Sequence, residues 1–316
     1  MSAAPTGTTT PTSTDTDTTT DHSRRTTMTD IEKRFETPGA ATLTVEVQQG
    51  DVTLTAGDRT DTVVRLVPHG RNGEEIAERY TVEAHGSDVT VTAPKGRDGL
   101  FSGLGWRGHV DVVVELPTGS RVDARTGSGD VSAHGLLGDV RAHTGSGDLS
   151  LQDLDSADLK SGSGDVVARA VAGGVSAKTG SGDITLESAG GHVDLVSGSG
   201  DLMLRRAEAT ARLKTGSGDV VVGSSAGDLD VMTGTGDVKL EGVHGGEIRA
   251  KTGTGDVAIF VAAGVAAYLD LNTVTGDVDV HLDETDGPDG SESQASLAVQ
   301  SGSGDVLVSR ARVRVS

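Results

Sequence analysis

Residues Arg125 to Gln152 read RTGSGDVSAHGLLGDVRAHTGSGDLSLQ and contain the same Gly-Ser-Gly-Asp turn twice, 18 residues apart. The turn, or a close variant of it, recurs along the chain with its aspartate at 130, 148, 165, 183, 201, 219, 237, 256, 277 and 305. The separations are 17 to 19 residues as far as Asp256, and then 21 and 28 residues. Self-similarity at a nearly constant period is typical of a solenoid, in which each repeat stacks on its neighbours.

Each period contains two short patterns of alternating apolar residues. One follows the aspartate, as in Leu202 and Leu204, and the other lies about nine residues later, as in Ala211 and Leu213. Apolar residues at i and i+2 point to one face of a strand, so each coil of about 18 residues contains two strands and two turns. A three-sided coil with six-residue faces is the alternative, but it would place Asp139 at an apolar position. The repeat therefore predicts an all-β fold, a parallel two-sheet β-solenoid of the β-roll or β-helix type, over a thin core.

The chemistry of the turn suggests how it is held. Two glycines allow a sharp reversal because glycine adopts positive φ without steric cost. The aspartate is expected to accept nearby backbone N–H groups, as in an Asx-turn, and the preceding hydroxyl residues are expected to form a ladder. A basic residue often precedes the hydroxyl, and we expect this row to neutralise the turn aspartates in part. The row comprises Arg125, His143, Lys160, Lys178, Lys214 and Lys251.

The flanking regions divide the chain into three predicted parts. Residues 1–30 are a Thr-rich tail with almost no apolar residues, which is typical of disorder. Met28 is a candidate for the true start, because ordered patterning begins just after it. Residues 31–125 form a β-rich N-terminal region, an irregular cap continuous with the solenoid, and residues 126–316 form the repeat solenoid. The C-terminal coil is a candidate for end-to-end self-association with the exposed edge of another chain, and the alternative is that the basic ending SRARVRVS is a charged cap that blunts such pairing.

Composition excludes several classes of partner. The 316 residues carry a formal net charge of −20 and include no cysteine, so nucleic acid is a poor partner and disulfides are excluded. Aromatic residues make up only 2% of the chain, and small aliphatic side chains must fill the core. We find no apolar run long enough for a membrane span and no signal peptide. These observations predict a cytoplasmic protein that does not insert into membranes.

The TGSGDV repeats, the stretch VELPTGSRVDARTGSGDV and the lead-in TLTVEVQQGDVTL resemble a bacterial β-strand-repeat domain of unknown function called putative adhesin. The resemblance covers about residues 31–316. It implies a β-solenoid without established catalytic residues and a role in surface attachment.

The same residues allow three hypotheses about function. The first is a non-enzymatic scaffold or interaction protein of the adhesin type, with an unidentified protein or cell-surface partner and no cofactor. The second is a calcium-binding β-roll, although its usual unit has one residue between the last glycine and the aspartate, whereas here the two are adjacent. The third is a carbohydrate-active β-helix enzyme, for which we find no aromatic groove and no unique catalytic residue. The calcium candidates are Asp130, Asp148, Asp165, Asp183, Asp201, Asp219, Asp237 and Asp256.

Overall fold

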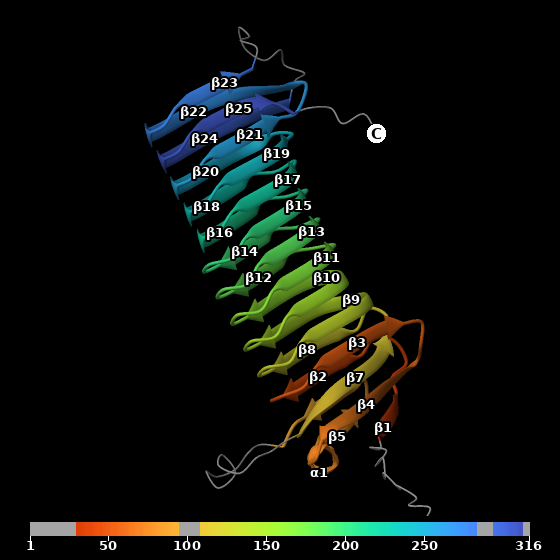
Figure 1. The fold of residues 1–316 in the computed structure, drawn as a ribbon. Coiled ribbons are helices and arrows are strands. Elements are labelled where there is room, and N and C mark those ends of the chain that lie inside the picture. The colour runs from red at the N-terminus through yellow and green to blue at the C-terminus, as the bar shows by residue number, and fades with distance from the viewer. Residues whose placement is uncertain (1–29, 95–107, 283–292, 312–316) are drawn as a thin grey trace, which may run out of the picture.

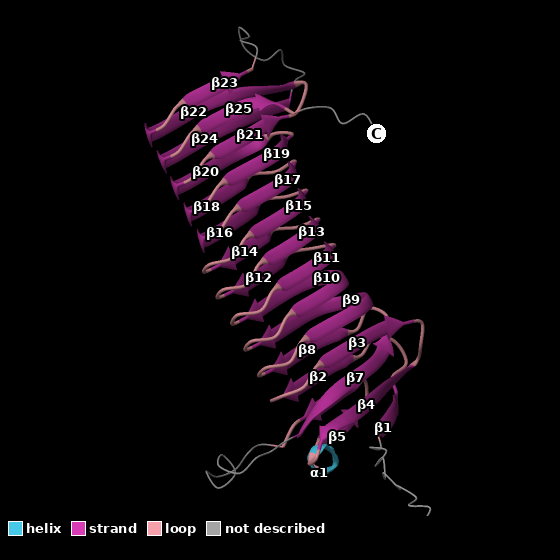
Figure 2. Ribbon diagram, viewed as in Figure 1, coloured by secondary structure: helices cyan, strands magenta, loops and turns pink. Residues whose placement is uncertain are grey.

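The computed structural model describes residues 30–94, 108–282 and 293–311, which form a long stack of coils (Figure 1). Strands account for nearly all of the regular structure, and the single short helix of these residues lies at the N-terminal end (Figure 2). The predicted all-β solenoid is confirmed. The Thr-rich tail before residue 30, Met28 and the last five residues of the basic ending lie outside the described residues.

Two stacks of parallel strands make the walls of the solenoid. Two strands, β9 (Val131–Thr144) and β10 (Leu149–Ser161), run through both walls. The wall that follows the Gly-Asp turns also contains β3 (Val52–Gly57), β7 (Gly108–Pro117), β11 (Val166–Val171), β13 (Ile184–Ala189), β15 (Leu202–Ala207), β17 (Val220–Ser225), β19 (Val238–Val243), β21 (Val257–Val261), β23 (Val278–His281) and β25 (Val306–Arg310). The opposite wall also contains β2 (Thr42–Val47), β6 (Asp88–Thr92), β8 (Arg121–Thr126), β12 (Val175–Thr179), β14 (Val193–Ser197), β16 (Ala211–Ser217), β18 (Leu229–Thr235), β20 (Gly246–Thr254), β22 (Val265–Thr275) and β24 (Ser293–Ser303).

The cross-section of a coil has one corner more than the sequence pattern predicts. Between β10 and β11 the register runs from Leu151–Ala168 to Asp153–Ala170 and skips the pair between them. The strand bends there and turns one further side chain of each coil into the core. This third buried position is occupied by Leu137, Leu154, Val171, Ala189, Ala207, Ser225, Val243 and Val261. The alternation rule misses it because the bend interrupts the period of two.

The order of coils in space differs from their order in sequence at both ends. Strands β24 and β25 pair with β20 and β21 on one side and with β22 and β23 on the other. The coil of residues 293–310 is therefore inserted between two coils that precede it in the chain. At the N-terminal end, β2 pairs with both β6 and β8, and β3 pairs with both β7 and β9. The expectation that the coil at the C-terminus of the chain forms the exposed end is wrong, because β22 and β23 form that end.

Antiparallel strands and the helix close the N-terminal end. Strand β4 (Asp61–Gly70) pairs antiparallel with β7 and with β1 (Ile31–Glu36), and β5 (Thr81–His85) pairs antiparallel with β6. Helix α1 (Gly73–Glu78) contributes Ile76 and Ala77, which are buried together with Tyr80. These elements cover the core that the outermost coil would otherwise expose.

Candidate functional site

The turn aspartates form a hydrogen-bonded ladder along one edge of the solenoid. The backbone N–H of each aspartate donates to Oδ1 of the aspartate in the adjacent coil, as from Asp219 to Asp201 at 2.8 Å. Within the described residues the bonds join, in spatial order, Asp111, Asp51, Asp130, Asp148, Asp165, Asp183, Asp201, Asp219, Asp237, Asp256, Asp305 and Asp277. The predicted alignment of acidic turns is therefore present, but each carboxylate bonds to the adjacent coil rather than within its own turn.

The hydroxyl residue of each turn also joins adjacent coils. Ser197 Oγ donates to the carbonyl of Gly182 in the adjacent coil at 3.0 Å and accepts the N–H of Gly200 in its own turn at 2.9 Å. Its equivalents are buried as well. The expected hydroxyl–hydroxyl ladder is replaced by bonds to backbone groups, which satisfy buried polar atoms at every turn.

The second glycine of the turn is required mainly by the close stacking of turns. A Cβ added to Gly200 would lie 1.9 Å from the carbonyl oxygen of Gly182, although Gly200 does not have a left-handed φ. At Gly218 the conformation also demands glycine, because its φ is +152°. Steric exclusion by the adjacent coil explains the repeated glycine better than turn conformation alone.

The basic row does not neutralise the turn aspartates. Its members point outward from the opposite wall, where Lys160 lies 3.0 Å from Asp158 and Lys178 lies 3.3 Å from Asp194. In the described parts of the chain, no ion pair joins this row to a turn aspartate. Side chains alternate along a strand, so a residue next to a buried hydroxyl shares its face with the residue two positions away. For Arg125 and Lys160 that residue is an aspartate of the same strand, whereas Lys178 pairs with Asp194 in the adjacent coil.

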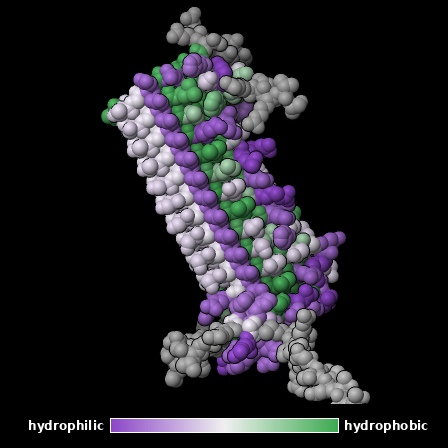
Figure 3. Space-filling model, viewed as in Figure 1, coloured by the Kyte–Doolittle hydropathy of each residue, from purple (hydrophilic) through white to green (hydrophobic). Residues whose placement is uncertain are grey.

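The candidate calcium ligands are therefore engaged in the structure of the turns. One oxygen of each carboxylate already accepts a backbone N–H, and in the described segments no group of three potential metal ligands includes a turn aspartate of the repeats. Calcium requires six to eight oxygen ligands, and this arrangement does not favour it. Figure 3 shows the turns as a pale column along one edge of the molecule, beside a continuous hydrophilic column.

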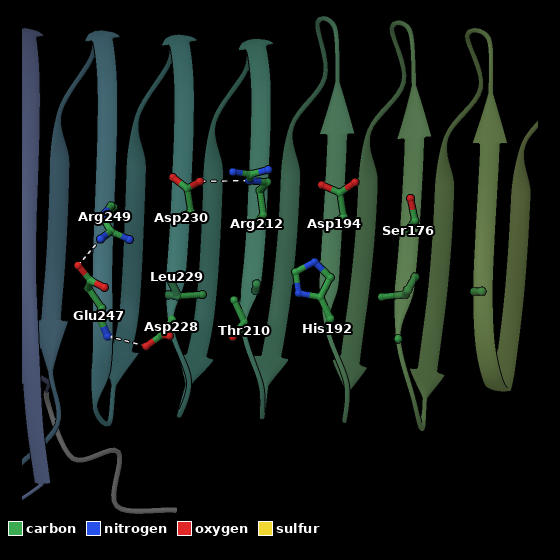
Figure 4. A pocket seen from close by; sticks show the side chains of 14 residues that line it. Ser176, His192, Asp194, Thr210, Arg212, Asp228, Leu229, Asp230, Glu247 and Arg249 are labelled. Atoms are coloured by element: carbon green, nitrogen blue, oxygen red, sulfur yellow. Dashed lines mark hydrogen bonds and ion pairs between the residues drawn. The ribbon is translucent and has the colours of Figure 1, made fainter.

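A shallow groove of about 710 Å³ crosses the outer face of the opposite wall, over β12 to β20 (Figure 4). Its charges are paired within the wall. Arg212 lies 3.1 Å from Asp230, Arg249 pairs with Glu247, and the N–H of Glu247 donates to Asp228 at 2.8 Å. An acid–base catalyst needs a group that can exchange a proton with a substrate, whereas these acids are held by arginines or backbone. The groove is lined by four acidic side chains and two arginines, so its surface carries a net negative charge.

The coil formed by β22 and β23, which we call the end coil, has one edge that pairs with no strand of the described residues. Val278 and Val280 are 42% and 43% exposed, whereas their partners Val306 and Val308 in the adjacent coil are 0% exposed. Tyr268, Leu269 and Val274 on β22 are also exposed. A further coil would bury the valines, as it does everywhere inside the stack.

Comparison with protein families gives two overlapping matches to the family described as Toastrack DUF4097, over residues 40–222 and 172–314. Together the matches cover the lead-in coils and the repeats. A comparison with curated proteins found no match. In the described residues, no helix is long and apolar enough to span a bilayer.

Comparison with solved structures gives matches of low sequence identity that cover most of both chains. A protein described as a putative adhesin from Bacteroides fragilis is 13% identical, with a TM-score of 0.37, and the match covers 89% of this chain and 97% of that one. A second putative adhesin, from Parabacteroides distasonis, is 10% identical, with a TM-score of 0.36 and coverage of 88% and 97%. A protein from the same species described as a putative lipid binding protein is 13% identical, with a TM-score of 0.35 and coverage of 88% and 96%.

Proposed function

This chain belongs to the Toastrack DUF4097 family, and from that premise we propose that it is a non-enzymatic interaction scaffold that joins a second copy of itself through the end coil. The surface attachment implied by the sequence resemblance is part of this proposal: pairing would present two solenoids as one longer rod with repeated polar faces. The observation that carries the proposal is the edge of β22 and β23, which has no partner strand in the part of the chain that the structure describes.

The chemistry of that edge supports another β edge as its occupant. Strand β22 is 11 residues long and contains one charged residue, Asp270. Natural edge strands are usually short or protected by lysine, proline or bulges, because unpaired N–H and C=O groups recruit further strands. The half-exposed valines of β23 add an apolar strip, so a partner can gain both backbone hydrogen bonds and apolar burial.

The capped N-terminal end supports a pair rather than a filament. Head-to-tail growth would require a receptive edge at both ends of the rod, but the strands that end the two walls at the other end, β1 and β5, are short, and four of the six residues of β1 are charged, which protects an edge from further pairing. Two end coils related by a twofold axis can pair antiparallel, and such an interface is complete with two copies. The proposal therefore specifies a dimer.

Light scattering coupled to size-exclusion chromatography over a concentration series tests the proposal. We expect a mass of twice 32.0 kDa for the wild type and a monomer for the double variant Val278→Lys/Val280→Lys. The control is Val167→Lys, because Val167 is equally exposed, at 42%, but lies in the middle of the stack. A monomeric mass for the wild type at every concentration, or a dimer that survives the double substitution with unchanged affinity, would refute the proposal. Inactivity on a polysaccharide panel is expected in parallel.

A further inference from the structure

Three potential metal ligands converge where the aspartate ladder begins. His69 on β4 and His109 on β7 are direct cross-strand partners in the antiparallel pair, and Asp111 lies two residues after His109 on the same face. One nitrogen of each histidine and one carboxylate oxygen of Asp111 all lie within 4.8 Å of one another. In the described residues this is the one group of its kind, and it lies far from the groove and the end coil.

The distances in this group are close to those of a tetrahedral zinc centre. Zn–N and Zn–O bonds of about 2.0–2.2 Å at tetrahedral angles place ligand atoms about 3.3 Å apart. Here Asp111 Oδ2 is 2.8 Å from His69 Nε2, and Asp111 Oδ1 is 3.8 Å from His109 Nε2. The two rings stack with centroids 4.8 Å apart and an angle of 19° between their planes. The carboxylate of Asp111 therefore faces both histidines, with one oxygen toward each.

Two further contacts indicate a prepared site. The Nε2 atom of His69 is buried, even though the rest of the ring is partly exposed, and it faces Asp111 Oδ2 at 2.8 Å. The carboxylate of Asp111 is oriented by the backbone N–H of Asp51, which donates to its Oδ1 at 2.9 Å. Such outer contacts hold ligating carboxylates in place in known metal sites.

We propose that His69, His109 and Asp111 bind a divalent transition-metal ion of the zinc type. Two imidazole nitrogens and one carboxylate suit zinc and its neighbours, whereas calcium and magnesium prefer oxygen alone. The three ligands leave one tetrahedral position for water or for a donor from another molecule. The ion would join β4 to β7 and fix the first carboxylate of the aspartate ladder, so that it stabilises the capped end of the rod.

Zinc and cobalt chloride are the probes for the untagged full-length protein. Isothermal titration should give one zinc ion per chain, cobalt should give the absorption of a tetrahedral complex, and zinc should raise the melting temperature. His109→Ala and Asp111→Asn should each weaken zinc at least tenfold. Lowering the pH should also weaken binding, because imidazole must lose its proton to bind a metal.

The control variant is His192→Ala, which removes an exposed histidine in the middle of the stack and should leave zinc affinity unchanged. Circular dichroism establishes that the variants are folded, and Asp111→Asn retains an oxygen for the bond from Asp51. The proposal is overturned if the wild type shows no zinc binding, or if His109→Ala and Asp111→Asn bind zinc as tightly as the wild type does.

Discussion

A substitution in the middle of the aspartate ladder separates its hydrogen bonds from its charge. Asp201 accepts the N–H of Asp219 through Oδ1, and its own N–H donates to Asp183, both at 2.8 Å. Asp201→Asn removes the charge and keeps an oxygen in the same place. Asp201→Ala removes both. Comparing the two variants isolates the contribution of the bond to the free energy of unfolding.

The magnitudes follow from the spacing of the coils. Carboxylates one rung apart, at about 4.8 Å, repel by about 0.9 kcal/mol in water. With two neighbours and physiological salt, neutralising Asp201 relieves about 1 kcal/mol. The asparagine bond is weaker than the carboxylate bond by about 1 kcal/mol, so Asp201→Asn should be nearly neutral. Asp201→Ala should be less stable than Asp201→Asn by about 1 kcal/mol.

Urea unfolding followed by circular dichroism at low and high salt measures these differences. Added salt should reduce the stability of Asp201→Asn relative to wild type, because screening removes the repulsion that the variant relieves. Hydrogen exchange at the Asp219 amide should accelerate in Asp201→Ala alone, and Ser199→Ala, in the same turn, serves as the control. Equal stability and equal exchange in the two Asp201 variants would show that the ladder bond does not hold the coils together.

Three other results are expected. Gly200→Ala should destabilise the protein by more than about 3 kcal/mol, because its Cβ would overlap the carbonyl of Gly182; Gly57→Ala, with open space around it, should be tolerated in the same melting experiment. Burial, and secondarily the charge of Lys160, lowers the pKa of His143. The unfolded chain therefore takes up this proton more readily, and stability should fall as the pH drops from about 7 towards 5. Melting curves of His143→Gln should show a smaller acid loss, and an unchanged pH profile would contradict this assignment. Finally, millimolar calcium should leave the melting temperature unchanged; a saturable increase, lost when turn aspartates are replaced by asparagine, would instead support the calcium hypothesis.

The repeat could be predicted from the sequence because its turns and strands are defined by residues that lie close together in the chain. Each Gly-Asp turn can be recognised from five consecutive residues, and alternating apolar residues identify two strands per coil. The contacts between coils could not be predicted in this way, because they join residues far apart in the chain. Asp51 belongs to the ladder although its turn, Gln-Gln-Gly-Asp, has only one glycine, and it meets Asp130 from 79 positions away. The Gly-Asp pair followed by Val52 is the sequence signal that could have identified this turn as a member of the ladder.

The ends of the stack depended on information that the repeat does not contain. The separations of 21 and 28 residues were consistent with loops between consecutive coils, and nothing in them specified that a later coil inserts between two earlier ones. The group at His69, His109 and Asp111 was also missed, because antiparallel pairing brings together two histidines 40 positions apart. No periodic pattern marks such a pair.

The inserted coil has a consequence for synthesis on the ribosome. Residues 265–281 emerge before residues 293–310, yet their native neighbour is the later segment. Until residues 293–310 have been synthesised, the earlier segment lacks its native partner, and any pairing it makes with β20 and β21 is one that the native fold does not contain. The last steps of folding must therefore wait for residues 293–310, and a nascent chain stalled before them would expose the strand edges that these residues cover in the native fold.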